Sequence, residues 1–239
     1  MALSAARALF RLSWALCFLA LAGCLPGADW GAGPGSAPPP GTTPEFVLAA
    51  ERVEPVARAL CRERRIARRC DFVFAVDSRP DQPPNAFQTL DRSGRPWVVL
   101  TPALIADARN ADELAFVMGH EAGHHILGHI PKREDQAREG AALAAVLASV
   151  AGASPDEVRK AQTIGAALAA EQYSQDFELE ADVLGAEIAW RAGFDAVKGA
   201  GFLARLPDPG NQAWGSHPSN ARRRALVAQT VAVLEAGGS

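Results

Sequence analysis

The pentapeptide HEAGH, residues 120–124, constrains the fold of this 239-residue chain more than any other stretch. It lies in a segment, residues 111–130, whose apolar residues recur at helical intervals, so we expect a helix there. Side chains four residues apart project from one face of a helix, which places the imidazoles of His120 and His124 one turn apart. Because neutral imidazoles are preferred zinc ligands, the pattern predicts a metal site, although so short a pattern also arises by chance.

The glutamate inside the pentapeptide suits a catalytic role. Glu121 lies about 60° round the helix from His124 at 100° per residue. Its carboxylate would therefore stand beside a metal without being forced to bind it, and could take a proton from water held there. A catalytic zinc site also needs a third protein ligand and an open fourth position.

The stretch FELEAD, residues 177–182, supplies candidates for the third ligand. Glu178 and Asp182 are one helical turn apart, whereas Glu180 points about 160° away from Glu178. One carboxylate of such a pair can bind the metal while the other accepts the N–H of a ligating histidine. We therefore assign Glu178 to the metal and Asp182 to a place behind His120. A solvated acidic helix face, or Glu180 as the ligand, are the alternatives.

The composition is that of an ordinary globular protein, with 49% hydrophobic and 21% charged residues. The length is sufficient to bury a sizeable core. The formal net charge of -3 excludes a global basic field for nucleic acid. Five arginines between residues 62 and 69 form a local basic run, which we interpret as a solvated helix end.

The first residues predict export and anchoring. Arg7 and Arg11 precede a short apolar run, residues 12–22, which is typical of a secretory signal. LAGC, residues 21–24, resembles the bacterial lipobox, which implies cleavage before Cys24 and lipid attachment to its sulfur; an ordinary signal peptide is the alternative. Leu25 then favours the outer membrane, facing the periplasm. The expected organisation is a signal peptide at residues 1–23, a lipidated Pro/Gly-rich tether at 24–44 and a folded domain at 45–239.

Cysteine usage agrees with an oxidising compartment. Cys17 would leave with the signal and Cys24 would carry lipid, so Cys61 and Cys70 remain. These two form a plausible disulfide. Two buried free thiols are the alternative.

The rest of the chain predicts an α+β fold that is mostly helical. A helix beginning at Phe46 has a possible break at Pro55. Three strand-like runs follow, and the short connection DRSG between the second and third predicts a small antiparallel sheet beside the HEAGH helix. Thr101 can cap a short helix, Asn110 or Asp112 begins the HEAGH helix, and Pro131 ends it. The expected strands are 71–77, 85–90 and 95–101, and the later helices are 133–153, one or two within 154–193, and 221–236.

The order of these motifs resembles the HtpX-type zinc metallopeptidases, the family of the CAAX prenyl endoproteases and the BepA-like enzymes. HEAGH is followed 54 residues later by ELEAD. NAF at 85–87 and TPALI at 101–105 match segments before the HExxH helix. SHPSNARR contains His217-Pro218-xxx-Arg222, like the family's His-Pro-xxx-Arg element. The resemblance covers roughly residues 46–230.

The resemblance implies a zincin-type domain of the gluzincin kind that holds one Zn²⁺ per chain. His120, His124 and Glu178 correspond to the zinc ligands, and Glu121 corresponds to the general base. His217 corresponds to a residue that stabilises the oxyanion or gates the metal, with Arg222 as its structural partner.

The resemblance also implies how substrate binds. Asn85, Ala86 and Phe87 correspond to a strand to which a substrate backbone adds by β-augmentation. Relatives often continue NAF with a Pro-Gly-Gly turn, whereas this chain has QTLDRSG, and they often have Ser-Arg where this chain has Ser174-Gln175. Tetratricopeptide repeats and the membrane helices of HtpX are absent from this sequence.

We therefore expect a zinc metalloendopeptidase that hydrolyses extended or misfolded envelope proteins at the periplasmic face of the outer membrane, held there by a lipid anchor. A catalytically quiet, metal-bearing chaperone for outer-membrane assembly is the main alternative. A structural lipoprotein with a chance HExxH, and a latent enzyme in which His217 occupies the fourth metal position, are the others. We expect His125 and His129 to be structural histidines.

Overall fold

The computed structural model describes residues 40–79, 81–172, 174–208 and 218–237. The predicted signal peptide, Cys24, most of the tether and His217 lie outside these residues. Within them, no helix combines the length and apolarity needed to cross a bilayer. The elements in chain order are α1 Pro44–Arg64, β1 Val73–Val76, β2 Ala86–Leu90, β3 Pro96–Leu100, α2 Pro102–Asp107, α3 Ala111–Ile126, α4 His129–Val150, α5 Pro155–Gln172, α6 Ser174–Arg191, α7 Ala196–Gly199, the 3-10 helix η1 Ala200–Arg205 and α8 Asn220–Gly237.

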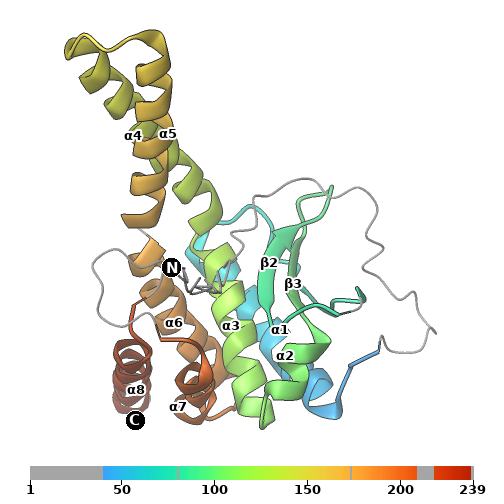
Figure 1. The fold of residues 1–239 in the computed structure, drawn as a ribbon. Coiled ribbons are helices and arrows are strands. Elements are labelled where there is room, and N and C mark those ends of the chain that lie inside the picture. Colours follow the sequence, from blue (N-terminus) through green and yellow to red (C-terminus); the bar gives the residue numbers. More distant parts are fainter. Residues whose placement is uncertain (1–39, 80, 173, 209–217, 238–239) are drawn as a thin grey trace, which may run out of the picture.

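Helix α3, which carries HEAGH, is the centre of the fold. It lies between the sheet on one side and α6 on the other, with α1 packed behind it (Figure 1). Its apolar side chains are almost fully buried, among them Leu114, Phe116, Met118 and Ile126. A helix that is apolar nearly all round is stable only inside a core, which explains why the other elements surround it.

Two glycines bring α3 and α6 unusually close. A Cβ atom at Gly119 would lie 2.7 Å from the carbonyl oxygen of Gly185, and a Cβ atom at Gly185 would lie 2.7 Å from the backbone nitrogen of His120. Real Cβ atoms do not approach backbone atoms this closely, so only glycine fits at either position. This contact sets the distance between the two helices that carry the predicted ligands.

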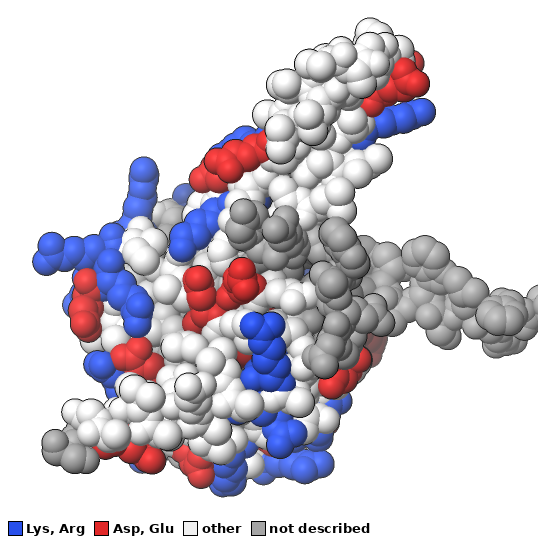
Figure 2. Space-filling model, turned by 90° about the vertical axis from the view of Figure 1, so that its left-hand side faces the viewer, with Lys and Arg blue, Asp and Glu red and all other residues white. Residues whose placement is uncertain are grey.

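Helices α4 and α5 form an antiparallel hairpin that projects away from the body (Figure 1). Ser154 precedes α5, and its amide and its hydroxyl both donate to Glu157 Oε2, at 2.8 and 2.7 Å, as in a capping box. In the face shown in Figure 2, the hairpin carries acidic and basic side chains near its tip and its base and is uncharged between them.

The sheet has the strand order β1-β3-β2 and is mixed rather than antiparallel. Strands β2 and β3 pair antiparallel, as predicted, but β1 pairs parallel to β3, with Val73 opposite Trp97, so the prediction of an all-antiparallel sheet was wrong for β1. Local turn chemistry identifies a hairpin, whereas the direction of β1 depends on the chain path from α1, which carries no comparable turn signal.

Strand β2 lies at one edge of the sheet. The amide of Thr101 donates to the carbonyl of Asn85 at 2.9 Å, so in this register residues 85, 87 and 89 bond to β3. The N–H and C=O groups of Ala86 and Gln88 therefore point away from β3, towards the free edge.

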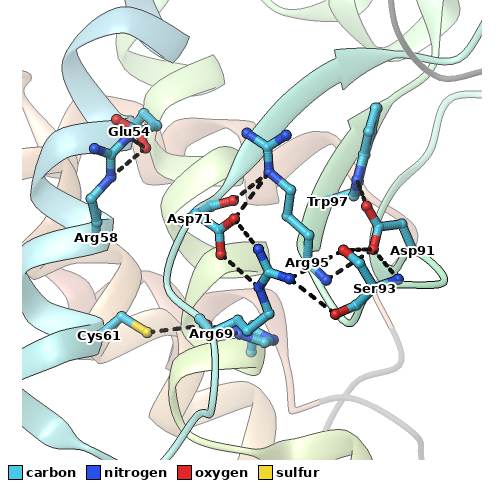
Figure 3. A network of polar contacts seen from close by, with 10 residues as sticks. Glu54, Arg58, Cys61, Arg69, Asp71, Asp91, Ser93, Arg95 and Trp97 are labelled. Atoms are coloured by element: carbon cyan, nitrogen blue, oxygen red, sulfur yellow. Dashed lines mark hydrogen bonds and ion pairs between the residues drawn. The ribbon is translucent and has the colours of Figure 1, made fainter.

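A polar network fixes the connection between β2 and β3 (Figure 3). Asp91 accepts hydrogen bonds from the amides of Ser93 and Arg95, at 2.8 and 3.0 Å, and from the Ser93 hydroxyl at 2.7 Å. The Ser93 hydroxyl and the Arg95 amide lower the pKa of Asp91 to about 2. Arg69 joins this turn to the segment before β1, since it donates to Ser93 and pairs with Asp71. The turn QTLDRSG thus holds the edge strand in place without a Pro-Gly-Gly sequence.

The helix boundaries show which local rules held. Asn110 caps α3 by accepting from the Glu113 amide at 3.0 Å, and Thr101 caps α2, as predicted. Pro55 lies inside an unbroken α1. The prediction that Pro131 ends the HEAGH helix was wrong: α3 ends at Ile126, and Gly128, with φ of 68°, turns the chain into α4. Cys61 and Cys70 are joined in a disulfide.

Candidate metal centre

Three donor side chains from α3 and α6 converge at the cleft. The Nε2 atoms of His120 and His124 lie 3.1 Å apart. Glu178 places Oε2 3.4 Å from His120 Nε2 and Oε1 3.3 Å from His124 Nε2. These three residues form the His/His/Glu group that could hold a metal ion among the residues the structure describes.

The spacing of these donors fits zinc. Zn–N and Zn–O bonds of about 2.0–2.2 Å in a tetrahedron put neighbouring ligand atoms about 3.3–3.6 Å apart. The two imidazole nitrogens lie 3.1 Å apart, and each lies 3.3 or 3.4 Å from a different oxygen of Glu178, so the donors are near that spacing. Two imidazoles and one carboxylate leave the fourth position of the tetrahedron open, as in catalytic zinc sites.

The far ring nitrogen of His120 is held by a carboxylate, as the Glu-xxx-Asp spacing predicted. Asp182 Oδ1 lies 3.0 Å from His120 Nδ1, so an Nδ1–H donates to it and leaves Nε2 for a metal. Arg223 donates to both oxygens of Asp182, at 2.7 and 2.8 Å, and also lies 3.3 Å from Glu178. Asp182 and Arg223 are both buried, and their mutual pairing satisfies two charges that would otherwise be costly to bury.

The arginine in this network is not the one that the sequence pattern indicated. Arg222 is exposed near the start of α8, where its amide donates to the Ser219 hydroxyl at 3.4 Å. Arg223 is the next residue, about 100° further round the helix, and that rotation turns its side chain into the protein. His217, the proposed partner of Arg222, lies outside the described residues.

The far ring nitrogen of His124 is also held, in this case by His129, which we expected to be a structural histidine. His124 Nδ1 lies 2.9 Å from His129 Nδ1, and His129 Nε2 lies 3.1 Å from Glu180 Oε2. The His129 ring is buried and stacks on Phe177, with centroids 4.4 Å apart. Only one tautomer of each ring suits a metal on His124 Nε2: His124 donates from Nδ1, and His129 then donates from Nε2 to Glu180.

The prediction of one unbroken helix up to Pro131 did not anticipate this contact. On one unbroken helix His129 would point away from His120 and His124, but the left-handed turn at Gly128 brings it back towards them. The sequence signal that could have revealed it is the Gly-His pair directly after the HEAGH helix.

The charges of the centre favour a cation. Burial lowers the pKa of His120, but Glu178 and Asp182 outweigh it and raise that pKa to about 10. Burial, together with the neighbouring His124, lowers the pKa of His129 to about 3. Burial also raises the pKa of Glu121, although the two histidines oppose this effect. The carboxylates thus stabilise positive charge where the three donors meet, and His129 stays a neutral hydrogen-bonding ring.

A cleft of about 400 Å³ opens over the three donors. Its lining includes Asn85 and residues 86–88 of strand β2 on one side, and Glu121, Phe177 and Arg223 on the others. The predicted substrate strand, Asn85 to Phe87, therefore borders the same space as the predicted base and ligands. This volume lies within the range typical of ligand sites.

Comparisons with known proteins point the same way. The model of peptidase family M48 matches residues 48–230. The beta-barrel assembly-enhancing protease of Escherichia coli (strain K12) is 35% identical over 120 residues, which is 46% of this chain and 24% of that protein. The mitochondrial metalloendopeptidase OMA1 of Arabidopsis thaliana is 29% identical over 143 residues, 58% of this chain and 28% of that protein. The chain thus spans about a quarter of the length of these relatives.

Proposed function

The chain belongs to peptidase family M48 and is a metalloendopeptidase, and from this premise we propose that it uses zinc to cleave extended or misfolded proteins of the bacterial envelope. One observation supports the choice of metal: two imidazole nitrogens lie 3.1 Å apart, and each lies 3.3 or 3.4 Å from an oxygen of one carboxylate on a helix far away in sequence, near the edge length of a zinc tetrahedron. The third donor is a carboxylate, which makes the centre one of the gluzincin kind.

A zinc ion held by His120, His124 and Glu178 would polarise a scissile carbonyl and make a nearby water more acidic. Glu121, one residue along from His120 and lining the cleft, is the base that accepts the proton of the attacking water. Because burial raises the pKa of Glu121, its carboxyl can hold that proton and then pass it to the leaving amine. Asp182 and His129 fix the tautomers of the two histidine ligands throughout.

The shape of the cleft supports an extended substrate. The outward N–H and C=O groups of Ala86 and Gln88 offer a backbone in the cleft two pairs of hydrogen-bonding partners. Such pairing requires a peptide without its own secondary structure, which selects unfolded or misassembled chains. The printed name of the Escherichia coli relative, a beta-barrel assembly-enhancing protease, suggests envelope proteins as the substrate class. Lipidation at Cys24 would keep the enzyme at the periplasmic face of the outer membrane.

Degradation of casein, an extended polypeptide, tests the proposal. We expect wild-type protein to bind one zinc and cleave casein, Glu121→Gln to bind zinc without cleavage, and His120→Ala to lose both. Glu134→Gln, on the exposed side of α4, is the matched control and should behave as wild type. A Glu121→Gln protein that still cleaves would remove Glu121 as the base. A wild-type protein that binds zinc and captures unfolded chains without cleaving them would favour the quiet chaperone.

A further inference from the structure

The α4–α5 hairpin has its large and small side chains in unusual places. Most of its large apolar side chains are exposed: Leu143 62%, Val146 59%, Leu147 62%, Val150 83%, Ile164 60% and Leu168 46%. The small residues are the ones between the helices. A Cβ atom at Gly140 would lie 2.4 Å from the carbonyl oxygen of Gly165, and one at Gly165 would lie 2.5 Å from the Cβ of Ala144.

This arrangement is the reverse of that found in water-soluble helical hairpins. In a water-soluble helical hairpin the large apolar side chains face the partner helix, because burying them provides the stability. Helices in lipid pack through Gly, Ala and Ser instead, since close backbone approach is the main attraction left, and they turn large apolar side chains outward. The hairpin follows the second pattern.

Four of the large side chains lie on one face. Three directly precede a residue of the interhelical contact: Leu143 before Ala144, Ile164 before Gly165 and Leu168 before Ala169. The fourth, Leu147, lies one helical turn after Leu143 and so on the same face. A two-fold axis perpendicular to an antiparallel helix pair relates equivalent positions, so residues one step before the contact fall on the same side of both helices. The result is an apolar stripe of two large side chains from each helix, Leu143 and Leu147 of α4 with Ile164 and Leu168 of α5, which we name the hairpin stripe.

The charges define how the hairpin stripe can be used. Residues 140–155 and 161–170 contain no charged side chain, whereas Asp156, Glu157, Arg159 and Lys160 sit at the tip. Figure 2 shows charged groups near both ends of the hairpin and an uncharged surface between them. Charges at the tip would oppose end-on entry into hydrocarbon. A hairpin lying on its side keeps these charges in water and buries only the stripe.

We propose that the hairpin stripe docks on a lipid bilayer, with Leu143, Leu147, Ile164 and Leu168 in the boundary between headgroups and acyl chains. The predicted tether allows this, because its roughly 20 residues reach about 65 Å when fully extended, far enough for the hairpin to meet the membrane that holds Cys24. A second copy of the chain fits less well: six large side chains are few beside the roughly 20–30 residues that each partner of a stable interface supplies. The proposal does not depend on the catalytic function.

An environment-sensitive fluorophore placed on the hairpin tests the proposal. The full chain carries Cys17→Ser and Cys24→Ser, which remove the thiols outside the disulfide and the lipid anchor, together with Val150→Cys as the labelling site. We expect vesicles of phosphatidylethanolamine and phosphatidylglycerol to shift the emission to shorter wavelength, and brominated lipid to quench it. Leu147→Glu with Ile164→Glu should lower the apparent vesicle affinity seen by this probe about tenfold.

Matched controls come from α7 and α8. Val233 is 66% exposed and Val197 is 45% exposed, so Val197→Glu with Val233→Glu adds the same charges elsewhere, and a probe at Val233→Cys reports on a surface outside the hairpin. The double variant Val197→Glu with Val233→Glu should leave the vesicle-dependent shift of the probe at position 150 unchanged. The probe at Val233→Cys should show no such shift. No shift at position 150 with vesicles would overturn the proposal. An emission shift that appears without vesicles and grows with protein concentration would also overturn it and would identify a second copy as the occupant. An emission shift caused by unfolded casein alone would overturn it as well.

Discussion

Asp182 on α6 holds His120 on α3 from behind, with Oδ1 3.0 Å from Nδ1, across 62 residues of sequence. The same carboxylate takes two hydrogen bonds from Arg223 on α8. Burial raises the pKa of Asp182, but Arg223 and His120 outweigh it and hold that pKa below its ordinary value. One ionised carboxylate thus connects three helices and fixes the tautomer of a proposed metal ligand.

Asp182→Asn keeps the shape of the side chain and removes its charge. We expect zinc affinity to fall about 10–100-fold, because His120 loses its orienting acceptor. We also expect a stability loss of about 3 kcal/mol, because the buried Arg223 loses its main partner. Competition with a chromophoric chelator and thermal unfolding measure the two effects. Asp176→Asn, exposed on the same helix, should change neither; equal zinc affinity in Asp182→Asn and wild type would refute the orienting role.

His129→Phe tests the other ligand's support. Phenylalanine can still stack on Phe177 but cannot accept the Nδ1–H of His124. We expect zinc affinity to fall about tenfold with little change in the stability of the metal-free protein. His125→Gln is the matched control, because His125 bonds to the carbonyl of Arg69 at 2.7 Å and not to a ligand. That variant should lose stability and keep its zinc affinity, and the reverse pattern in the two variants would exclude a role for His129.

The comparison of His129 with His120 shows where sequence reasoning works and where it stops. Within one helix, the period of 3.6 residues fixes which side chains share a face, so the His120–His124 pair and the Glu178–Asp182 pair were predictable. Beyond Gly128 the helical period of α3 no longer predicts where side chains point, because this residue has a left-handed backbone conformation that changes the direction of the chain. The helical period alone therefore could not place His129 beside His124, although the pair Gly128-His129 indicates that a new helix begins there.

Arg222 and β1 show the same limit at larger scale. Neighbouring residues on a helix point about 100° apart, so Arg222 is exposed whereas Arg223 pairs with Asp182. No local feature of the run ARRR distinguishes these two arginines. The direction of β1 depends on how α1 returns to the sheet, which no turn signal encodes. Hairpins, caps and the faces of single helices are local and were predicted. The contact of Asp182 with His120 between two helices was also predicted, because each partner lies on a face that its own helix fixes, whereas the position of Arg223 and the direction of β1 were not.

Gly185→Ala tests whether helix spacing sets the metal geometry. The added Cβ would lie 2.7 Å from the backbone nitrogen of His120, so α6 must move away from α3. We expect a stability loss of about 1–3 kcal/mol from overpacking. Because Glu178 moves with α6, zinc affinity should fall as well. Gly201→Ala, whose nearest neighbour would be 3.9 Å away, should leave zinc affinity intact. Unchanged zinc affinity in Gly185→Ala would show that the donors tolerate a wider helix spacing.

Gln88→Pro tests backbone pairing at the sheet edge. It removes an N–H that points away from β3, so the existing ladder survives, and proline is tolerated at such edge positions. We expect kcat/KM for an unfolded polypeptide to fall about tenfold, since a hydrogen bond in the transition state is worth about 1–1.5 kcal/mol. Zinc affinity should not change.

Two variants separate this effect from its alternatives. Gln88→Ala removes the side-chain amide, whose atoms have no partner among the described residues, and keeps the backbone N–H. Leu90→Pro removes an equivalent edge N–H outside the residues that line the cleft. If Gln88→Ala loses as much activity as Gln88→Pro, the side chain is responsible and β-augmentation is not supported.

Glu113 is a specific group through which acid should destabilise the fold. It is 3% exposed and accepts hydrogen bonds from both terminal nitrogens of Arg205, at 2.8 and 2.7 Å, and from the Arg109 amide at 2.8 Å. Burial raises the pKa of Glu113, but these donors outweigh it and hold that pKa below its ordinary value. A carboxylate with a lowered folded pKa stabilises the native state above its unfolded pKa, and this contribution disappears as the pH falls through the folded value.

Glu113→Gln should therefore flatten the acid side of the stability profile. We expect the variant to be less stable by about 1–3 kcal/mol at neutral pH, because Arg205 loses its charged partner. Between about pH 5 and pH 3, its Tm should fall less steeply than that of wild type. Both proteins are measured with excess chelator, so that proton-linked zinc release does not contribute. Glu134→Gln, an exposed change on α4, should keep the wild-type slope. Parallel Tm curves for wild type and Glu113→Gln would show that the pKa of Glu113 does not change on folding and that the acid sensitivity arises elsewhere.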